Sequence, residues 1–250
     1  MADALASDRR AGRLGGELAA LAATLLVVLA VRVVLFQPNT IPSSSMEPGV
    51  RTGDYLFITK FDYGWSRHSI PLSPPLFAGR ILERAPRRGD VVVFKLPRDT
   101  RQLYIKRVIG LPGDRIEMRG GVLSVNGRPA PRAILGPTQD PEAPDVTVTQ
   151  VRETAPDGAS YVTYDRGAGL PGDDVAPFVV PPGRYFMLGD NRDNSLDSRW
   201  PAAVGVGLVP IENLVGRARF VVVSWRQGAS LLKPWTWLNL APERFFKPLR

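Results

Sequence analysis

An apolar stretch near the start of the chain restricts the fold more than any other feature. It runs from Leu18 to Phe36 and reads LAALAATLLVVLAVRVVLF, in which Arg32 is the only strongly polar residue. As an α-helix it would be about 28 Å long, close to the thickness of the hydrocarbon core of a bilayer. The stretch therefore predicts one transmembrane helix over 18–36, in which Arg32 lies close enough to one end to reach the headgroups.

The charges that flank this stretch predict its orientation. Three arginines precede it: Arg9, Arg10 and Arg13. No cation follows until Arg51. Because positive charges concentrate on the cytoplasmic side of membrane proteins, we expect residues 1–17 to form a short cytoplasmic N-terminus, with the rest of the chain on the extracytoplasmic side.

A cleaved signal peptide is the alternative interpretation of the same stretch. Val28 and Ala30 would satisfy the small-residue pattern of a cleavage site. The apolar run continues beyond that site through 33–36, which favours an uncleaved anchor. In both interpretations the body of the protein is exported.

The chain after the anchor has the pattern of a mainly β protein. Eight short β-branched or aromatic runs are predicted as strands: 54–60, 90–95, 104–109, 115–118, 122–125, 161–164, 184–188 and 217–225. Asn126-Gly127 predicts a tight hairpin turn, since both residues accept positive φ. No long amphipathic helix is visible outside the anchor, so the strands are expected to form antiparallel sheets.

Composition divides the part of the chain after the anchor into three regions. Residues 119–183 are acidic and rich in Pro and Gly, and are predicted to form an inserted smaller β subdomain. Residues 37–118 and 184–226 are predicted to form the larger β body. Residues 227–250 form an aromatic C-terminal segment. Aromatic and apolar residues in that segment and around 70–77 suit a membrane surface, although packing under loops is an equal alternative.

The charge balance, the absence of cysteine and the single histidine restrict the functions that this protein can have. The net charge is +8, but no basic run interleaved with aromatics and no nucleic-acid-reading motif is present, so we expect no nucleic-acid partner. A basic face next to anionic membrane lipids explains the charge as well. The chain has no cysteine, which excludes thiol catalysis, and one histidine, His68, which excludes His-rich metal sites.

Catalysis without these groups is possible with a serine and a lysine. A buried lysine loses its proton more readily, and the neutral amine is a competent base for a hydroxyl. Ser43-Ser44-Ser45 lies just after the anchor between prolines, and Lys106 lies in the predicted strand YIKRVI. Taken alone, a serine-rich loop after an anchor is more typical of a linker. Taken alone, a lysine in a strand is more typical of a side chain that reaches solvent.

A polar loop, GDNRDNSLDSR over 189–199, follows the predicted strand RYFML. A calcium-binding loop is excluded, because its third position would be Arg192 and its twelfth Pro201. Its three acids, two arginines and several hydroxyls predict internal pairing that holds the loop in one shape.

Four blocks together resemble a known family. SSSMEPG (43–49), RRGDVVVFK (87–95), YIKRVIGLPGD (104–114) and GDNRDNSLDSR (189–199) occur in the order and spacing of bacterial signal peptidase I. The family consists of membrane-anchored Ser/Lys endopeptidases that remove signal peptides from exported precursors, and it requires no cofactor or metal. The resemblance covers Gln37 to about Trp225, apart from 119–183.

The resemblance implies roles for individual residues. Ser45 would be the nucleophile, Lys106 the general base, and Ser43 would join the Ser45 backbone N–H in an oxyanion hole. Ser195 would orient the Lys106 amine. Loop supports would be Asp197, Arg199, Asp190 and Arg192. Substrates of the family have small residues at positions −1 and −3, and the matching pocket walls would be Ile41, Pro42, Tyr104 and Ile105.

Two departures from the family pattern are visible. Ser44 stands where the family usually has Gly, and Gly49-Val50 stands where it usually has Thr-Leu. Two other functions remain open at this point. One is a catalytically inactive, membrane-tethered β scaffold; the other is a self-cleaving Ser/Lys regulator, which would be expected to have a DNA-binding domain and no anchor.

Overall fold

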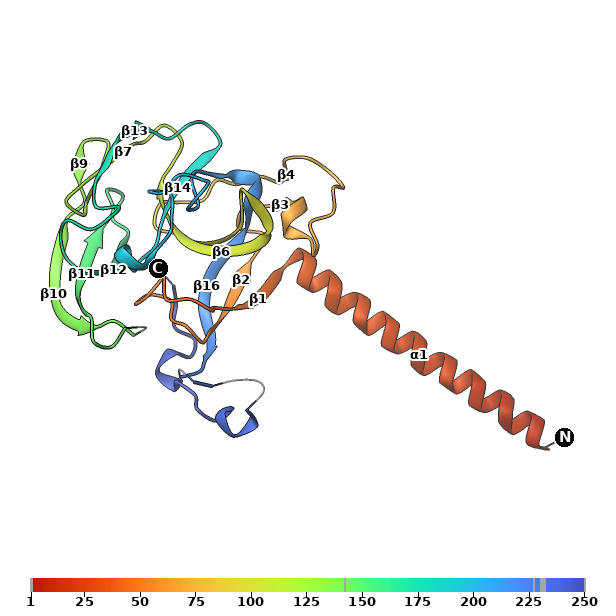
Figure 1. Cartoon of the computed structure of the whole chain (residues 1–250). Helices are drawn as coiled ribbons and strands as arrows, with labels where there is room; N and C mark the ends of the chain where they lie inside the picture. The colour runs from red at the N-terminus through yellow and green to blue at the C-terminus, as the bar shows by residue number, and fades with distance from the viewer. Residues whose placement is uncertain (1, 142, 227, 230–232, 250) are drawn as a thin grey trace.

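The apolar stretch forms the end of a long helix. The computed structural model describes residues 2–141, 143–226, 228–229 and 233–249. Helix α1 runs over Ala2–Val34 and extends away from the β body (Figure 1). Its segment Gly16–Val34 is long and apolar enough to cross a membrane and is not buried against the body. The side chains of residues 2–15, which include the three N-terminal arginines, lie outside the description.

The helix ends two residues before the predicted boundary. Phe36 begins strand β1 and pairs with Thr59, and its ring lies 4.9 Å from that of Phe57. The Phe36 ring therefore packs within the sheet. Two hydrogen bonds fix the junction: Trp65 Nε1 donates to Val34 O at 2.7 Å, and Lys60 N donates to Leu35 O at 3.0 Å.

Antiparallel strands make up the body, which confirms the predicted fold class. The strands are β1 Phe36–Thr40, β2 Asp54–Thr59, β3 Trp65–Ser66, β4 Arg80–Ile81, β5 Val91–Leu96, β6 Asp99–Gly110, β7 Arg115–Arg119, β8 Val122–Val125, β9 Arg128–Pro129, β10 Arg132–Gln139, β11 Thr147–Thr154, β12 Ser160–Asp165, β13 Val175–Val179, β14 Arg184–Leu188, β15 Val209–Pro210 and β16 Leu214–Ser224. Short 3₁₀ turns lie at Arg67–Ser69 (η1), Arg192–Asn194 (η2), Ile211–Asn213 (η3), Pro234–Thr236 (η4) and Pro242–Arg244 (η5).

The largest sheet has seven strands in the order β1-β2-β16-β5-β6-β14-β15. Strand β6 lies between β5 and β14, and the last six of its residues, 105–110, are all buried. A strand covered on both faces loses the alternation of apolar and polar residues, and its polar side chains must find partners inside the protein. Lys106 and Arg107 both lie in this covered part.

The middle of the chain forms two smaller sheets, β13-β7-β8-β9 and β10-β11-β12. The predicted hairpin turn is confirmed, since Asn126 and Gly127 have φ of 54° and 75° between β8 and β9. Strand β7, which the compositional division places with the larger body, pairs with β8 and β13. The pattern missed β10, because Gly136 and Pro137 interrupt its apolar run.

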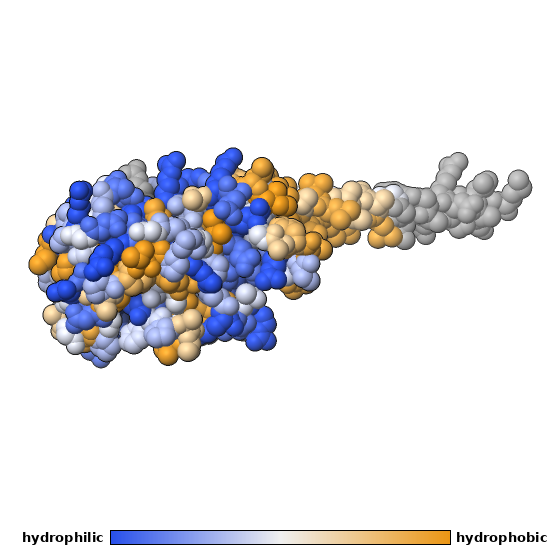
Figure 2. All heavy atoms as spheres, turned by 90° about the horizontal axis from the view of Figure 1, so that it is seen from above, coloured by the Kyte–Doolittle hydropathy of each residue, from blue (hydrophilic) through white to orange (hydrophobic). Residues whose placement is uncertain are grey.

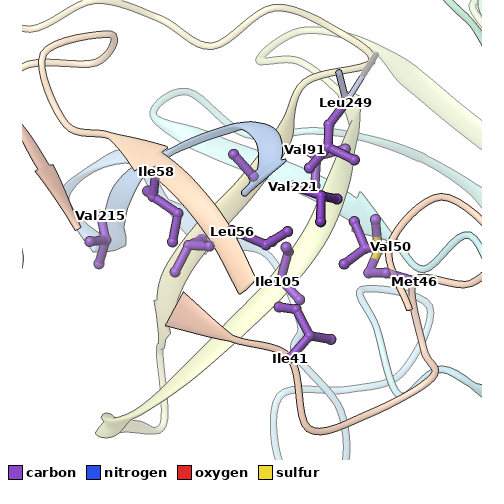
Figure 3. Packing of buried hydrophobic residues seen from close by; sticks show 12 residues of the cluster. Ile41, Met46, Val50, Leu56, Ile58, Val91, Ile105, Val215, Val221 and Leu249 are labelled. Atoms are coloured by element: carbon purple, nitrogen blue, oxygen red, sulfur yellow. The ribbon is translucent and has the colours of Figure 1, made fainter. Parts of the chain in front are cut away.

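Buried aliphatic residues hold the large sheet to the segment that follows β1. Figure 3 shows Ile41, Met46 and Val50 packed with Ile105 of β6 and with residues of β2, β5 and β16. Met46 and Val50 are completely buried. Packing of this kind orders the short segment over 41–50, which contains the three serines, although it has no regular secondary structure of its own.

Candidate functional site

Ser45 and Lys106 lie side by side although 61 positions separate them in the sequence. Ser45 lies in the turns that follow β1, Lys106 lies in β6, and Lys106 Nζ is 2.5 Å from Ser45 Oγ. Ser45 is half-buried and Lys106 is only 3% exposed. The pair is thus a hydroxyl in hydrogen-bond contact with an amine, the arrangement that a lysine base requires.

The surroundings of Lys106 favour its neutral form. Burial lowers the pKa of Lys106 from 10.5 to about 8, since the ammonium loses its hydration. Asp197 and Asp190 act in the opposite direction, while Arg199 lowers the pKa further. At a pH near 8, a substantial fraction of the side chain is an amine with a free lone pair.

A cavity of about 520 Å³ opens at this pair. Eight of the residues expected at the site line it: Pro42, Ser43, Ser45, Tyr104, Ile105, Lys106, Arg192 and Ser195. Six further residues, which sequence reasoning did not select, complete the wall: Leu103, Pro171, Asp193, Asn194, Leu196 and Trp200. The apolar members form a surface next to the Ser–Lys pair, where a small apolar side chain of a peptide could be held.

Ile41 does not line this cavity, although it was expected in a pocket wall. It is 5% exposed and belongs to the aliphatic core below Ile105 (Figure 3). Strand pairing explains this: the chain enters the core directly after β1, so Pro42 is the first residue of the segment to reach the cavity.

One internal ion pair holds the loop over 189–199, which is part of the internal pairing that its composition predicts. Arg199 binds Asp197 through two parallel contacts, with Nε to Oδ1 at 2.8 Å and Nη2 to Oδ2 at 2.9 Å. Asp197 also accepts from Gly189 N at 3.0 Å. Burial alone would raise the pKa of Asp197, but Arg199 and this N–H hold it below its ordinary value, so the carboxylate stays charged.

The other three charged residues of the loop have partners outside it, and one of these, Asp193, accepts from Arg166 N at 2.7 Å. Asp190 forms a double contact with Arg107 of β6, at 2.7 and 2.6 Å, and both side chains are buried. Arg192 forms a double contact with Glu153 of β11, at 2.9 and 2.7 Å. Because the sequence places Arg107 and Glu153 in unrelated strands, neither partner was predicted.

Close backbone packing brings the loop against the serines. Asn191 N donates to Ser45 O at 3.2 Å, and Asn194 Nδ2 donates to Ser44 Oγ at 2.8 Å. A Cβ on Gly189 would lie 2.5 Å from Ser45 O and would also overlap Ser195. Only glycine fits there. Ser195 is buried beside the cavity, and its Oγ has no partner of hydrogen-bond geometry among the described residues.

A second buried lysine has a different environment. Lys60 is completely buried and donates to Ser69 O. Burial lowers the pKa of Lys60 to about 8, and Arg32 contributes. Its hydrogen bond is to a carbonyl rather than to a hydroxyl, so it lacks the geometry of a base for a nucleophile. A shifted pKa alone would not have distinguished the two lysines.

Loss of the buried Arg107–Asp190 pair should destabilise the protein strongly. We expect Asp190→Ala to cost about 3–5 kcal/mol, because an unpaired guanidinium would remain in the core. This corresponds to a fall in Tm of about 10 °C, measurable by thermal unfolding in detergent. As a control, Asp99→Ala removes the partner of Arg101, a side chain that is 90% exposed, and should leave Tm within about 1 °C. Equal Tm values for the two variants would contradict a strong contribution of the buried Arg107–Asp190 pair to stability.

A match to a family model gives the class of the protein. The model for "Signal peptidase, peptidase S26" matches residues 16–225, which include α1 from Gly16, all four sequence blocks and both smaller sheets. The chain belongs to this signal peptidase family, a family of peptidases and therefore of hydrolases.

Individual relatives agree with this assignment. The chain is 37% identical over 252 residues to a signal peptidase I of Rickettsia typhi, with 93% of each chain covered. It is 36% identical to a signal peptidase I of Rickettsia prowazekii, again with 93% of each covered. A crystal structure of a signal peptidase I from Enterococcus faecalis is 28% identical, with 54% of this chain and 97% of that chain covered, at a TM-score of 0.32. This score is too low to compare the arrangement of the sheets.

Proposed function

We propose that this protein is a membrane-anchored serine endopeptidase that cleaves N-terminal signal peptides from exported precursor proteins, with Ser45 as nucleophile and Lys106 as general base. The observation that carries the proposal is the 2.5 Å contact between Ser45 Oγ and a lysine that is only 3% exposed. Family membership supports precursors bearing signal peptides as the substrate class.

In the proposed mechanism, neutral Lys106 takes the proton of Ser45 Oγ as this oxygen attacks the scissile carbonyl carbon. The negative charge on the carbonyl oxygen would be stabilised by Ser45 N–H and the Ser43 hydroxyl. The lysine ammonium then gives its proton to the leaving amine, which releases the mature protein. A water molecule, activated by the same lysine, hydrolyses the ester to Ser45 and releases the signal peptide.

The residues around the pair would position it and select the substrate. Ser195 would accept or donate a hydrogen bond at Lys106 Nζ once substrate closes the cavity, since catalytic contacts often tighten only in the complex. Asp197 with Arg199 would hold Ser195 in place. Pro42, Tyr104 and Ile105 would form the walls that accept small side chains before the cut. No cofactor or metal is part of the proposal.

Activity should rise with pH through the ionisation of Lys106. Because the neutral amine is the active form and its pKa lies at about 8, kcat/KM on a signal-peptide substrate should increase about five-fold from pH 7 to pH 8 and level off above pH 9. The measurement is a pH–rate profile of the detergent-solubilised full chain. A profile governed instead by an ionisation near pH 6.5, the range of a histidine, would contradict the lysine base.

We further propose that α1 anchors the protein with its N-terminus in the cytoplasm and the β body on the extracytoplasmic side, in contact with membrane lipids. The chain has no cysteine, so a single introduced one reports its own location. Asp145→Cys should react with a membrane-impermeant maleimide in spheroplasts, and Ser7→Cys should react only after lysis. The reverse pattern would contradict this orientation.

A further inference from the structure

A second cavity lies where α1 joins the β body. Its volume is about 420 Å³, and apart from Leu103 it shares no residue with the cavity at Ser45. Polar and apolar side chains from six segments line it, among them Leu29 and Arg32 of α1, Gln37 of β1, His68 and Leu72 of the segment around η1, and Lys95 of β5. It is therefore built jointly by the membrane helix and the body.

The charged side chains at this cavity are mostly cations. Arg32 and Lys95 both line it, and neither forms an ion pair within the described part of the chain. An adjoining recess of about 340 Å³ shares His68, Leu72 and Lys95 and adds Arg67 and Arg101. The nearby Asp99 is already bound by Arg101 at 2.9 Å and by Gln102 at 3.0 Å. The excess positive charge would attract an anion.

A buried donor without an acceptor points to the same kind of ligand. His68 is 4% exposed, and its Nε2 accepts from Arg67 Nε at 3.3 Å, so the ring proton of the neutral form is on Nδ1. His68 Nδ1 is buried and has no hydrogen-bond partner among the described residues, and Ser73 Oγ in the adjoining recess has none either. An unsatisfied buried donor is costly, and an anionic oxygen in the cavity would satisfy it.

The position of the cavity favours a lipid over a free anion. Leu29 and Arg32 belong to the last turns of the apolar segment Gly16–Val34. In the proposed orientation of α1 they would lie where headgroups meet the hydrocarbon. Leu72 at the rim is 99% exposed, and Leu76 nearby is 70% exposed. Figure 2 shows the apolar surface of the helix continuing onto the adjacent end of the body. Acyl chains could thus follow the apolar side while a phosphate occupies the cationic side.

We propose that this cavity binds the headgroup phosphate of one anionic phospholipid of the phosphatidylglycerol type, through Arg32, Lys95 and His68 Nδ1. The inference rests on the proposed membrane orientation of α1 but not on the proposed peptidase mechanism, because its evidence comes from residues away from Ser45 and Lys106. A lipid bound there would attach the β body to the membrane next to the C-terminal end of α1.

The test is lipid retention by the full chain in detergent, measured by native mass spectrometry during titration with phosphatidylglycerol. We expect one lipid to bind to the wild-type protein and the double variant Arg32→Gln/Lys95→Gln to bind it about ten-fold more weakly. The matched control Arg128→Gln/Arg152→Gln removes the same charge from exposed positions on the smaller sheets and should bind like the wild type. Equal binding by both double variants would overturn the proposal.

Three further measurements test whether the cavity is specific for an anionic lipid. Leu72→Glu places a negative charge at a fully exposed rim position, so it should leave folding unchanged and weaken phosphatidylglycerol binding similarly. Phosphatidylcholine with the same acyl chains should bind about ten-fold more weakly than phosphatidylglycerol. Inorganic phosphate at equal concentration should not displace the lipid. Displacement by phosphate, equal retention of phosphatidylcholine, or unchanged binding by Leu72→Glu would each contradict an anionic lipid site.

Discussion

Lys106→Arg is expected to lower kcat/KM on a signal-peptide substrate by about 10⁴-fold or more, although the positive charge is kept. A guanidinium stays protonated at every pH at which the protein is folded, so it cannot take the proton of Ser45 Oγ. The burial that lowers the pKa of Lys106 to about 8 cannot bring an arginine into the same range. The measurement is steady-state cleavage of a precursor peptide by the detergent-solubilised full chain.

Ser195→Ala is the matched comparison for this loss. It leaves the lysine in place and removes only a hydroxyl next to the cavity, so a smaller loss, about 10–10²-fold, is expected. Its pH profile should keep the rise through about pH 8, whereas Lys106→Arg should have no such rise. Near-normal turnover by Lys106→Arg would contradict the assignment of Lys106 as base.

Ser45→Ala is expected to abolish precursor cleavage, with a residual rate lower by about 10⁴-fold or more. Removal of Oγ takes away the atom 2.5 Å from Lys106 Nζ that would form the bond to substrate. The same substitution leaves the aliphatic packing of Met46 and Val50 unchanged, so Tm should change by no more than about 2 °C. Comparison of product formation with thermal unfolding separates loss of chemistry from loss of fold.

The adjacent serines serve as controls, because three lie in a row. Ser44→Ala removes the acceptor for Asn194 Nδ2 and should lower stability more than Ser45→Ala, while product is still formed. Ser43→Ala should cost about 10²–10³-fold in kcat, as expected for one donor of an oxyanion hole. If the Ser45→Ala variant still cleaved the precursor, another serine would have to be the nucleophile. A wild-type protein that leaves precursors uncut would indicate the scaffold function.

Much of the fold follows from local patterns. The apolar stretch predicts the helix because 19 positions with Arg32 as their only strongly polar residue have the length and apolar character that a bilayer requires, and α1 includes Gly16–Val34. Short β-branched or aromatic runs between turn residues predict most strands of the large sheet, and Asn126-Gly127 predicts its turn because few other pairs accept positive φ twice. The four ordered blocks indicate the family, which the matches confirm.

Other elements could not be predicted because their cause is not local. The end of α1 at Val34 depends on the pairing of Phe36 with Thr59, which an apolar residue at that position does not reveal. Strand β7 fits the larger body by composition but pairs within a smaller sheet. The family resemblance implies that Ile41 forms a pocket wall, yet its neighbours bury it in the core.

By itself, the sequence determined which chemistry is available: a chain with no cysteine and one histidine, a serine triplet after an apolar anchor, and a lysine within a strand. Only the tertiary structure decided that Ser45 and Lys106 meet, that Arg107 and Glu153 are the partners of Asp190 and Arg192, and that Gly189 must lack a side chain. The reason is physical. Residue type and local pattern reflect what a few neighbouring residues need, whereas desolvation, ion pairing and close contact depend on segments that are distant in the chain and adjacent only after folding.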